Sequence, residues 1–255
     1  MGRQVSLDTS KRVALVTGGS RGIGAATARL LLERGYAVCI NYRSNTAAAE
    51  NLLRELGSDD LIAVRADVAE EAQVLQLFEE IDARLGRIRA LVNNAAIVQT
   101  QTRVVDMSAQ RINSTFANNV TSAFLCSREA VKRMSTRYGG QGGAIVNVSS
   151  GAARLGSANE YVDYAASKGA LDTFTRGLSN EVAAEGIRVN SVRPGLIYTD
   201  MHASAGEPGR VDRLKSSIPM QRGGDPREVA QAIAWLLSDE ASYCTGSFID
   251  AAGGR

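Results

Sequence analysis

Short apolar runs alternate with longer amphipathic stretches along most of the chain, and this alternation constrains the fold more than any other feature. The stretches between the runs have helical periodicity, for example at residues 22–34 and 46–56. Continuous apolar strands that alternate with helices are typical of a parallel sheet covered by helices on both faces. The sequence therefore predicts an α/β fold of the Rossmann type, a doubly wound parallel sheet of about seven strands. The apolar runs cover residues 13–16, 37–40, 61–64, 91–92, 144–148, 187–192 and 247–249.

No stretch has the length or composition of a linker between domains. Two glycine-containing stretches, 137–143 and 202–210, are predicted to be loops, but both are short. The 255 residues suffice for one large α/β domain. We therefore expect residues 1–255 to form a single dinucleotide-binding domain, with residues 1–10 as a flexible tail. The first six residues match the loose myristoylation pattern, but that pattern specifies very few positions and we expect an ordinary polar tail instead.

Composition excludes several functional classes. The net charge is +2 and the basic residues are scattered, so neither a nucleic-acid surface nor a membrane surface is expected. No apolar run has the length of a membrane span. Three widely spaced cysteines and a single histidine favour reduced thiols over a disulfide framework or a metal site. These features are typical of a cytoplasmic protein.

A glycine-rich turn between the first strand and the first helix is the first candidate site. Glycines allow the backbone to turn tightly and to approach a pyrophosphate, which the N-terminus of the following helix stabilises. The spacing is G-x-x-x-G-x-G rather than the more familiar G-x-G-x-x-G. We expect the cofactor-binding residues here to be Thr17, Gly18, Ser20, Arg21, Gly22, Ile23 and Gly24.

The end of the second strand bears on the choice of cofactor. NAD-binding sites usually have an acidic residue there for the ribose 2′-hydroxyl, whereas this chain has Arg43 and Ser44. A guanidinium group can bind a 2′-phosphate through two hydrogen bonds, and Arg21 could face the same phosphate. The sequence therefore predicts NADP(H) rather than NAD(H), unless Arg43 merely begins a solvated loop.

Two further strand ends, and a pair of residues in an alanine-rich helix, complete the candidate residues. Asp67 and Val68 follow the third strand, while Asn94 and Ala95 follow the fourth. Tyr164 and Lys168 are four residues apart and therefore share one helix face. An ammonium beside the phenol would lower its pKa from about 10 and make Tyr164 a better acid and base near neutral pH.

Taken in order, the motifs resemble those of the short-chain dehydrogenase/reductase family. The resemblance extends from about Lys11 to Gly254 and is greatest to members related to 3-oxoacyl-carrier-protein reductases and glucose dehydrogenases. Two positions depart from the pattern: Ala96 replaces the usual glycine, and one extra residue separates Ser150 from Tyr164. The motifs are Thr17-Gly18-x-x-x-Gly22-x-Gly24, Asn93-Asn94-Ala95, Asn119, Ser150, Tyr164-x-x-x-Lys168 and Pro194-Gly195.

The resemblance implies a role for each catalytic position. Tyr164 would be the general acid in reduction and the base in oxidation, and Lys168 would lower its pKa and bind the nicotinamide ribose. Ser150, rather than the adjacent Ser149, would polarise the substrate carbonyl. Asn119 would hold a water molecule that links Lys168 to solvent. The resemblance also implies cofactor contacts from Asp67, Val68, Asn94, Ala95, Pro194, Gly195, Ile197 and Thr199.

We therefore expect an NADP(H)-dependent oxidoreductase that acts on a small carbonyl or alcohol substrate. A nucleotide-binding sensor without turnover and a sugar epimerase are the alternatives, but the motif set is intact and the chain lacks room for a second substrate domain. Family members are usually homotetramers, so a tetramer is expected. Tyr161 is expected to line the substrate pocket, Trp235 to be a core residue of the last helix, and His202 to lie at the surface or contact substrate. The substrate itself depends on variable loops, which the motifs do not specify.

Overall fold

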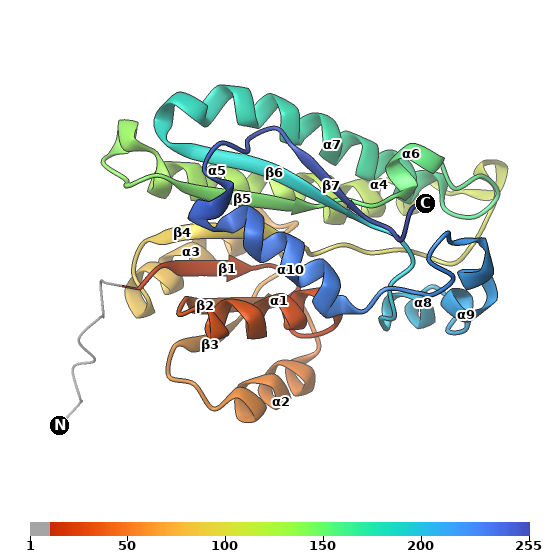
Figure 1. Cartoon of the computed structure of the whole chain (residues 1–255), viewed down its shortest axis with the longest axis horizontal. Helices are drawn as coiled ribbons and strands as arrows, with labels where there is room; N and C mark the ends of the chain where they lie inside the picture. Colours follow the sequence, from red (N-terminus) through yellow and green to blue (C-terminus); the bar gives the residue numbers. More distant parts are fainter. Residues whose placement is uncertain (1–10) are drawn as a thin grey trace.

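The computed structural model describes residues 11–255, so the expected tail and the possible myristoylation pattern at residues 1–10 lie outside the described residues. Figure 1 shows the single sheet that the described part forms, with helices on both sides. The strands are β1 (Val13–Val16), β2 (Ala37–Tyr42), β3 (Leu61–Arg65), β4 (Ile88–Asn93), β5 (Gly143–Val148), β6 (Ile187–Pro194) and β7 (Phe248–Ala251). The helices are α1 (Gly22–Glu33), α2 (Thr46–Leu56), α3 (Glu71–Arg84), α4 (Ala109–Phe116), α5 (Ser122–Met134), α6 (Ala152–Leu155), α7 (Val162–Val182), α8 (Met201–Ser204), α9 (Arg210–Leu214) and α10 (Pro226–Leu237).

The strand order is β3-β2-β1-β4-β5-β6-β7, and every neighbouring pair is parallel. The predicted fold class, a Rossmann-type doubly wound sheet, is therefore confirmed. The chain runs outward from β1 to β3 in one direction and from β4 to β7 in the other. This reversal between β1 and β4 opens a crevice beyond their carboxyl ends, where ligands of such sheets bind.

Alternate residues of each strand contribute to two separate cores, one on each face of the sheet. In β1, Ala14 and Val16 pack with α1, α2 and α10, whereas Val13 and Leu15 pack with α3, α5 and α7. All four of these side chains are at most 3% exposed. Burial on both faces explains why the strands appear in the sequence as continuous apolar runs rather than as alternating ones.

Two sequence predictions about helices were wrong in detail. Trp235, expected in the core, is 36% exposed, because α10 directs its other apolar residues toward the sheet. The predicted loop at 202–210 includes most of α8, and α9 begins at its end. Both helices are short, and Gly206, Pro208 and Gly209 between them obscured the helical periodicity. Within residues 11–255, no helix is long and apolar enough to cross a membrane.

Candidate active site

The turn between β1 and α1 needs glycine because its backbone lies against the loop after β4. Gly18 has a φ of +61°, and a Cβ at Gly24 would lie 2.4 Å from the carbonyl oxygen of Gly18. The amide of Asn94 donates to the carbonyls of Thr17 and Gly18 at 2.9 and 3.1 Å. The Thr17 hydroxyl accepts from the backbone N–H groups of Asn94 and Ala95, both at 3.0 Å. These contacts fix the two loops together at the crevice.

A groove of about 500 Å³ extends from this turn across the ends of β2 and β3. Arg43 lies on its rim with its side chain 53% exposed, and Arg21 lines the same groove. Arg43 donates to Asn118 Oδ1 at 2.8 Å and lies 3.9 Å from the Asp67 carboxylate. Asn118 thus holds the Arg43 guanidinium at the groove. The sequence had not predicted Asn118 as a site residue. Two arginines thus line this groove, and guanidinium groups can bind phosphates through paired hydrogen bonds.

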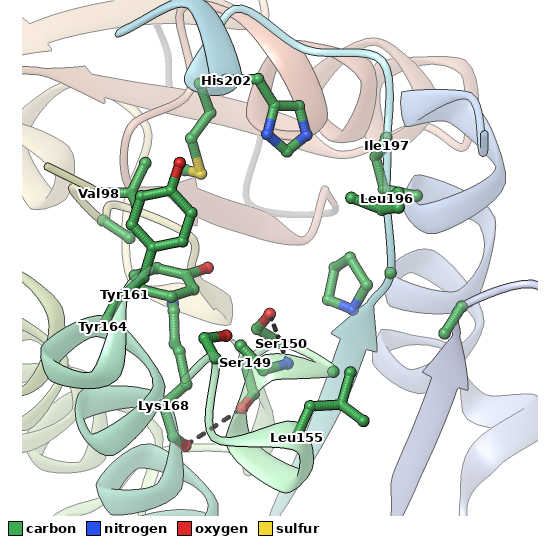
Figure 2. Close-up of a pocket in the computed structure, with 18 of the residues that line it drawn as sticks. Val98, Ser149, Ser150, Leu155, Tyr161, Tyr164, Lys168, Leu196, Ile197 and His202 are labelled. Atoms are coloured by element: carbon green, nitrogen blue, oxygen red, sulfur yellow. Dashed lines mark hydrogen bonds between the residues drawn. The ribbon is translucent and has the colours of Figure 1, made fainter. Parts of the chain in front are cut away.

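A second cavity, of about 470 Å³, adjoins the groove and is drawn in Figure 2. Ser150, Tyr164 and Lys168 all line it, although Ser150 follows β5 and the other two belong to α7. The groove and the cavity share Ile23, Asn94 and Thr199 among their lining residues. A ligand that extends along the groove would therefore reach the three candidate catalytic side chains.

The two adjacent serines differ in the partners of their hydroxyl groups. Ser149 is 2% exposed, and its hydroxyl donates to the carbonyl oxygen of Lys168 at 3.2 Å. The Ser150 hydroxyl accepts from the N–H of Ala152 at 3.1 Å and also forms a hydrogen bond with the Tyr164 phenol in the cavity. This difference favours Ser150 as the serine that can polarise a substrate oxygen.

Burial shifts the pKa values of Tyr164 and Lys168 in opposite directions. Burial raises the pKa of the Tyr164 phenol, and a hydrogen bond with Ser150 offsets this only in part. Lys168 Nζ donates to the carbonyl oxygen of Val148 at 2.7 Å and lies 5.6 Å from the centre of the Tyr164 ring. Burial lowers the pKa of Lys168 to about 8, with a partial opposing effect from Asp172. Burial therefore dominates the pKa of the phenol, and the Lys168 ammonium donates to the Val148 carbonyl. That the ammonium lowers the phenol pKa stays a prediction.

Asn119 lies behind the cavity, in a turn of π-helix at Ala117–Thr121 between α4 and α5. Its amide nitrogen donates to the Ile97 carbonyl and to the Ser167 hydroxyl, both at 3.0 Å. Its amide oxygen accepts from the N–H of Ile97 at 2.8 Å. Asn119 thus connects the loop after β4 to the helix that carries Tyr164. Single turns of π-helix occur often at functional sites.

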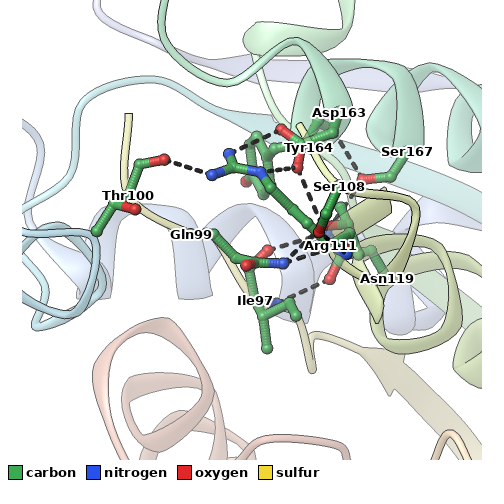
Figure 3. A network of polar contacts seen from close by, with 10 residues as sticks. Ile97, Gln99, Thr100, Ser108, Arg111, Asn119, Asp163, Tyr164 and Ser167 are labelled. Atoms are coloured by element: carbon green, nitrogen blue, oxygen red, sulfur yellow. Dashed lines mark hydrogen bonds and ion pairs between the residues drawn. The ribbon is translucent and has the colours of Figure 1, made fainter. Parts of the chain in front are cut away.

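An ion pair next to Tyr164 reinforces this connection (Figure 3). Arg111 donates to both carboxylate oxygens of Asp163 at 2.8 and 3.2 Å, with side chains 11% and 3% exposed. Arg111 also donates to the carbonyl oxygen of Thr100 at 2.7 Å. Burial alone would raise the pKa of Asp163. Hydrogen bonds from Arg111, the Tyr164 backbone and Thr115, together with the Arg111 charge, outweigh burial and lower the pKa. The pair fixes the first turn of α7 against α4 and the loop after β4.

The segment after β6 covers the cavity. His202 on α8 was expected either at the surface or in contact with substrate, and it lines the cavity. Burial lowers the pKa of its imidazole. Arg210 on α9 is 9% exposed and forms ion pairs with Glu160 and Glu207. Because Glu160 lies just before α7, its pair with Arg210 attaches the covering segment to the body of the protein.

Most of the predicted residues line one of the two spaces, and a few support them from behind. Thr17, Gly24 and Asn119 belong to the supporting set through the contacts described above. Asn118 and Arg210 were missed, because neither belongs to a local motif and each acquires its place through residues far away in the sequence. The groove is lined by Gly18, Ser20, Arg21, Gly22, Ile23, Arg43, Ser44, Asp67, Val68, Asn94, Ala95 and Thr199. The cavity is lined by Ile23, Asn94, Ser150, Tyr164, Lys168, Pro194, Gly195, Ile197 and Thr199.

Comparison with known proteins agrees with this geometry. A family model described as enoyl-(acyl carrier protein) reductase matches residues 18–255. The uncharacterized oxidoreductase YgfF of Escherichia coli is 63% identical over 246 residues, which cover 95% of this chain and 99% of that protein. A 3-oxoacyl-[acyl-carrier-protein] reductase of Bos taurus is 42% identical, covering 95% of this chain and 97% of the relative. A glucose and ribitol dehydrogenase homolog of Oryza sativa is 37% identical, covering 95% and 85%.

These matches extend over nearly the whole chain, and the sheet, the glycine turn and the Ser–Tyr–Lys cavity form one continuous arrangement. The resemblance inferred from the motifs is therefore confirmed. The protein is an oxidoreductase that belongs to the short-chain dehydrogenase/reductase family.

Proposed function

We propose that the protein uses NADP(H) to interconvert a small carbonyl compound and its alcohol, with Tyr164 as the general acid and base. The observation that carries this proposal is the convergence of Ser150, Tyr164 and Lys168 on one cavity that adjoins a groove with two arginines at its rim. A hydroxyl, a phenol and an ammonium around one space can hold a carbonyl oxygen and deliver a proton to it.

The described residues fit the cofactor. A Cβ at Gly18 would lie 3.0 Å from Ala95 Cα, so a side chain there would push the turn away from the loop after β4. A turn built from glycines allows its backbone N–H groups to approach a pyrophosphate. Arg43 and Arg21 would bind the 2′-phosphate, while Asp67 and Val68 would line the adenine end. Pro194, Gly195, Ile197 and Thr199 would lie against the nicotinamide. When bound, NADPH would supply a hydride at the cavity.

Each catalytic side chain then has a distinct task in reduction. The Ser150 hydroxyl donates a hydrogen bond to the substrate carbonyl and holds its carbon toward the groove. As the new C–H bond forms, the carbonyl electron pair moves onto oxygen, and Tyr164 Oη supplies the proton that makes the alcohol. The Tyr164 phenolate so formed is stabilised by the Lys168 ammonium, which can leave its bond to Val148 to approach it. Oxidation reverses these steps, with Tyr164 as the base.

The test compares NADPH and NADH binding by calorimetry in wild type and Arg43→Ala. We expect NADPH to bind at least tenfold more tightly than NADH, about 1.4 kcal/mol, and Arg43→Ala to remove that preference. Arg54→Ala is the matched control, because Arg54 is an exposed arginine on α2 that does not line the groove. Arg54→Ala should keep the wild-type preference for NADPH over NADH.

Two results would contradict parts of the proposal. Equal binding of both cofactors in wild type would refute the NADP preference and leave NAD-linked oxidation as the activity to assay. Binding without turnover of any carbonyl compound would favour the alternative that the protein is an inactive nucleotide-binding sensor. Tyr164→Phe should abolish turnover while retaining NADPH affinity, since the phenol hydroxyl acts on the substrate.

We further propose that the protein assembles as a homotetramer through α5 and α7. Phe124 on α5 is 49% exposed, and its ring lies 3.9 Å from that of Phe174 on α7. An exposed phenylalanine that packs on a partly buried one of the neighbouring helix supports a contact with another subunit.

A further inference from the structure

Tyr161 lies in the wall of the substrate cavity, three residues before Tyr164 and at the N-terminal end of α7. Figure 2 shows Tyr161 and Tyr164 on one side of this cavity and Leu196 and Ile197 on the other. Tyr161 is only 5% exposed. Among residues 11–255, its hydroxyl group finds no hydrogen-bond partner. A buried hydroxyl without a partner is unfavourable, and native proteins normally satisfy such groups or use them for function.

The surroundings of Tyr161 hold its ring in place. Its backbone N–H donates to the carbonyl of Ser157 at 3.0 Å, and its carbonyl accepts from Ala165 at 2.9 Å. The Arg210 guanidinium lies over the ring, 5.1 Å from its centre, and is itself held by Glu160 and Glu207. The ring is therefore held by two elements, the start of α7 and the covering helix α9. The hydroxyl is presented by a rigid support rather than by a mobile side chain.

The rest of the cavity wall combines polar side chains, among them Ser157, Thr199 and His202, with apolar ones. Val98, Leu155, Leu196 and Ile197 contribute apolar side chains. Arg210 has its charge compensated by two carboxylates. A ligand that places only hydrocarbon against Tyr161 would leave the phenol hydroxyl without a hydrogen-bond partner. A ligand oxygen at that point would supply the partner.

We propose that Tyr161 determines substrate specificity by forming a hydrogen bond with a second oxygen of the substrate. This inference rests on the proposed function, because it assumes that the reacting carbonyl lies at Ser150 and Tyr164. The substrates it selects are carbonyl compounds with a hydroxyl or carbonyl group on a nearby carbon, such as α-hydroxyketones and α-diketones. Residues three apart at a helix start lie on the same side, so one small molecule can reach both phenols.

The test measures kcat/KM for 2-butanone, 3-hydroxy-2-butanone and 2,3-butanedione in wild type and Tyr161→Phe. We expect Tyr161→Phe to lower kcat/KM about tenfold for the two oxygenated ketones, the effect of one lost hydrogen bond. The value for 2-butanone should change less than twofold. An equal change for all three compounds, or no change for any, would overturn the proposal.

Two controls separate specificity from structure. Tyr198→Phe removes a hydroxyl of the covering segment that is bonded to Asp212 at the surface, at 3.0 Å, and should leave the substrate ratios unchanged. Tyr161→Phe should melt at or above the wild-type temperature, because the hydroxyl has no protein partner. A clearly lower melting temperature would mean that the hydroxyl is bonded within the protein, which would also overturn the proposal.

A binding measurement keeps the inference testable if none of the ketones is turned over. In that case the proposed function has failed, and saturation-transfer NMR compares 2,3-butanediol with 2-butanol on wild type and Tyr161→Phe. A preference for the diol that disappears in Tyr161→Phe supports the hydrogen bond at Tyr161 even without hydride transfer. No preference in wild type refutes it.

Discussion

Replacing Lys168 by methionine should abolish turnover and yet stabilise the nucleotide-free protein. The ammonium is 2% exposed, and burial lowers its pKa from 10.5 to about 8. Such a depression corresponds to about 3 kcal/mol of lost stability at neutral pH, since the buried charge is disfavoured relative to the unfolded chain. Methionine loses the hydrogen bond to the Val148 carbonyl, which costs about 1 kcal/mol. The net gain is about 2 kcal/mol, or roughly 4–8 °C in melting temperature for a chain of this size.

The pH dependence gives this prediction a second signature. Below pH 8 the lysine is protonated in both the folded and the unfolded state, and the full penalty applies. Between pH 8 and about 10.5 the unfolded chain binds more protons, so wild-type stability should rise with pH. The advantage of Lys168→Met should therefore shrink between pH 7 and pH 10.

Differential scanning calorimetry of nucleotide-free protein at both pH values measures the effect. Lys215→Met is the matched control, because Lys215 is a partly exposed lysine on the covering segment and should show no stabilisation. The reasoning is refuted if Lys168→Met melts below wild type at pH 7, or if its advantage is the same at both pH values. Either result would mean that the ammonium is not disfavoured in the folded state.

Three further predictions follow from individual contacts. Arg111→Met should lower the free energy of unfolding in urea by about 3 kcal/mol, because it leaves the Asp163 carboxylate buried and unpaired. Adding Asp163→Asn should recover part of this loss. In wild type, the contribution of the pair to stability should disappear as the pH falls below about 4. Gly24→Ala should weaken NADPH binding at least tenfold in calorimetry, since the new methyl group would lie 2.4 Å from the Gly18 carbonyl; unchanged affinity would show that the turn can shift. Phe124→Asp should reduce the mass in light scattering to that of a smaller assembly, whereas an unchanged mass would place the subunit contact elsewhere.

The sequence by itself determined the fold class and most of the candidate site. Strands buried on both faces must be continuously apolar, so the β1 and β5 runs were visible without any structure. The glycine turn, Tyr164 and Lys168 were equally visible, because close backbone approach and a shared helix face depend on residues near one another in the chain. Local spacing is enough to recognise such motifs.

Only the tertiary structure decided how distant residues meet. It directed Lys168 toward Val148 rather than the phenol, and it exposed Trp235 while turning His202 into the cavity. It also brought Arg210 to Glu160, fifty residues earlier in the chain, where together they hold the wall that contains Tyr161. A charged or aromatic side chain has no periodicity that reveals its partner. Its role depends on which segments the fold packs beside it, and that is settled when the two cores close around the sheet.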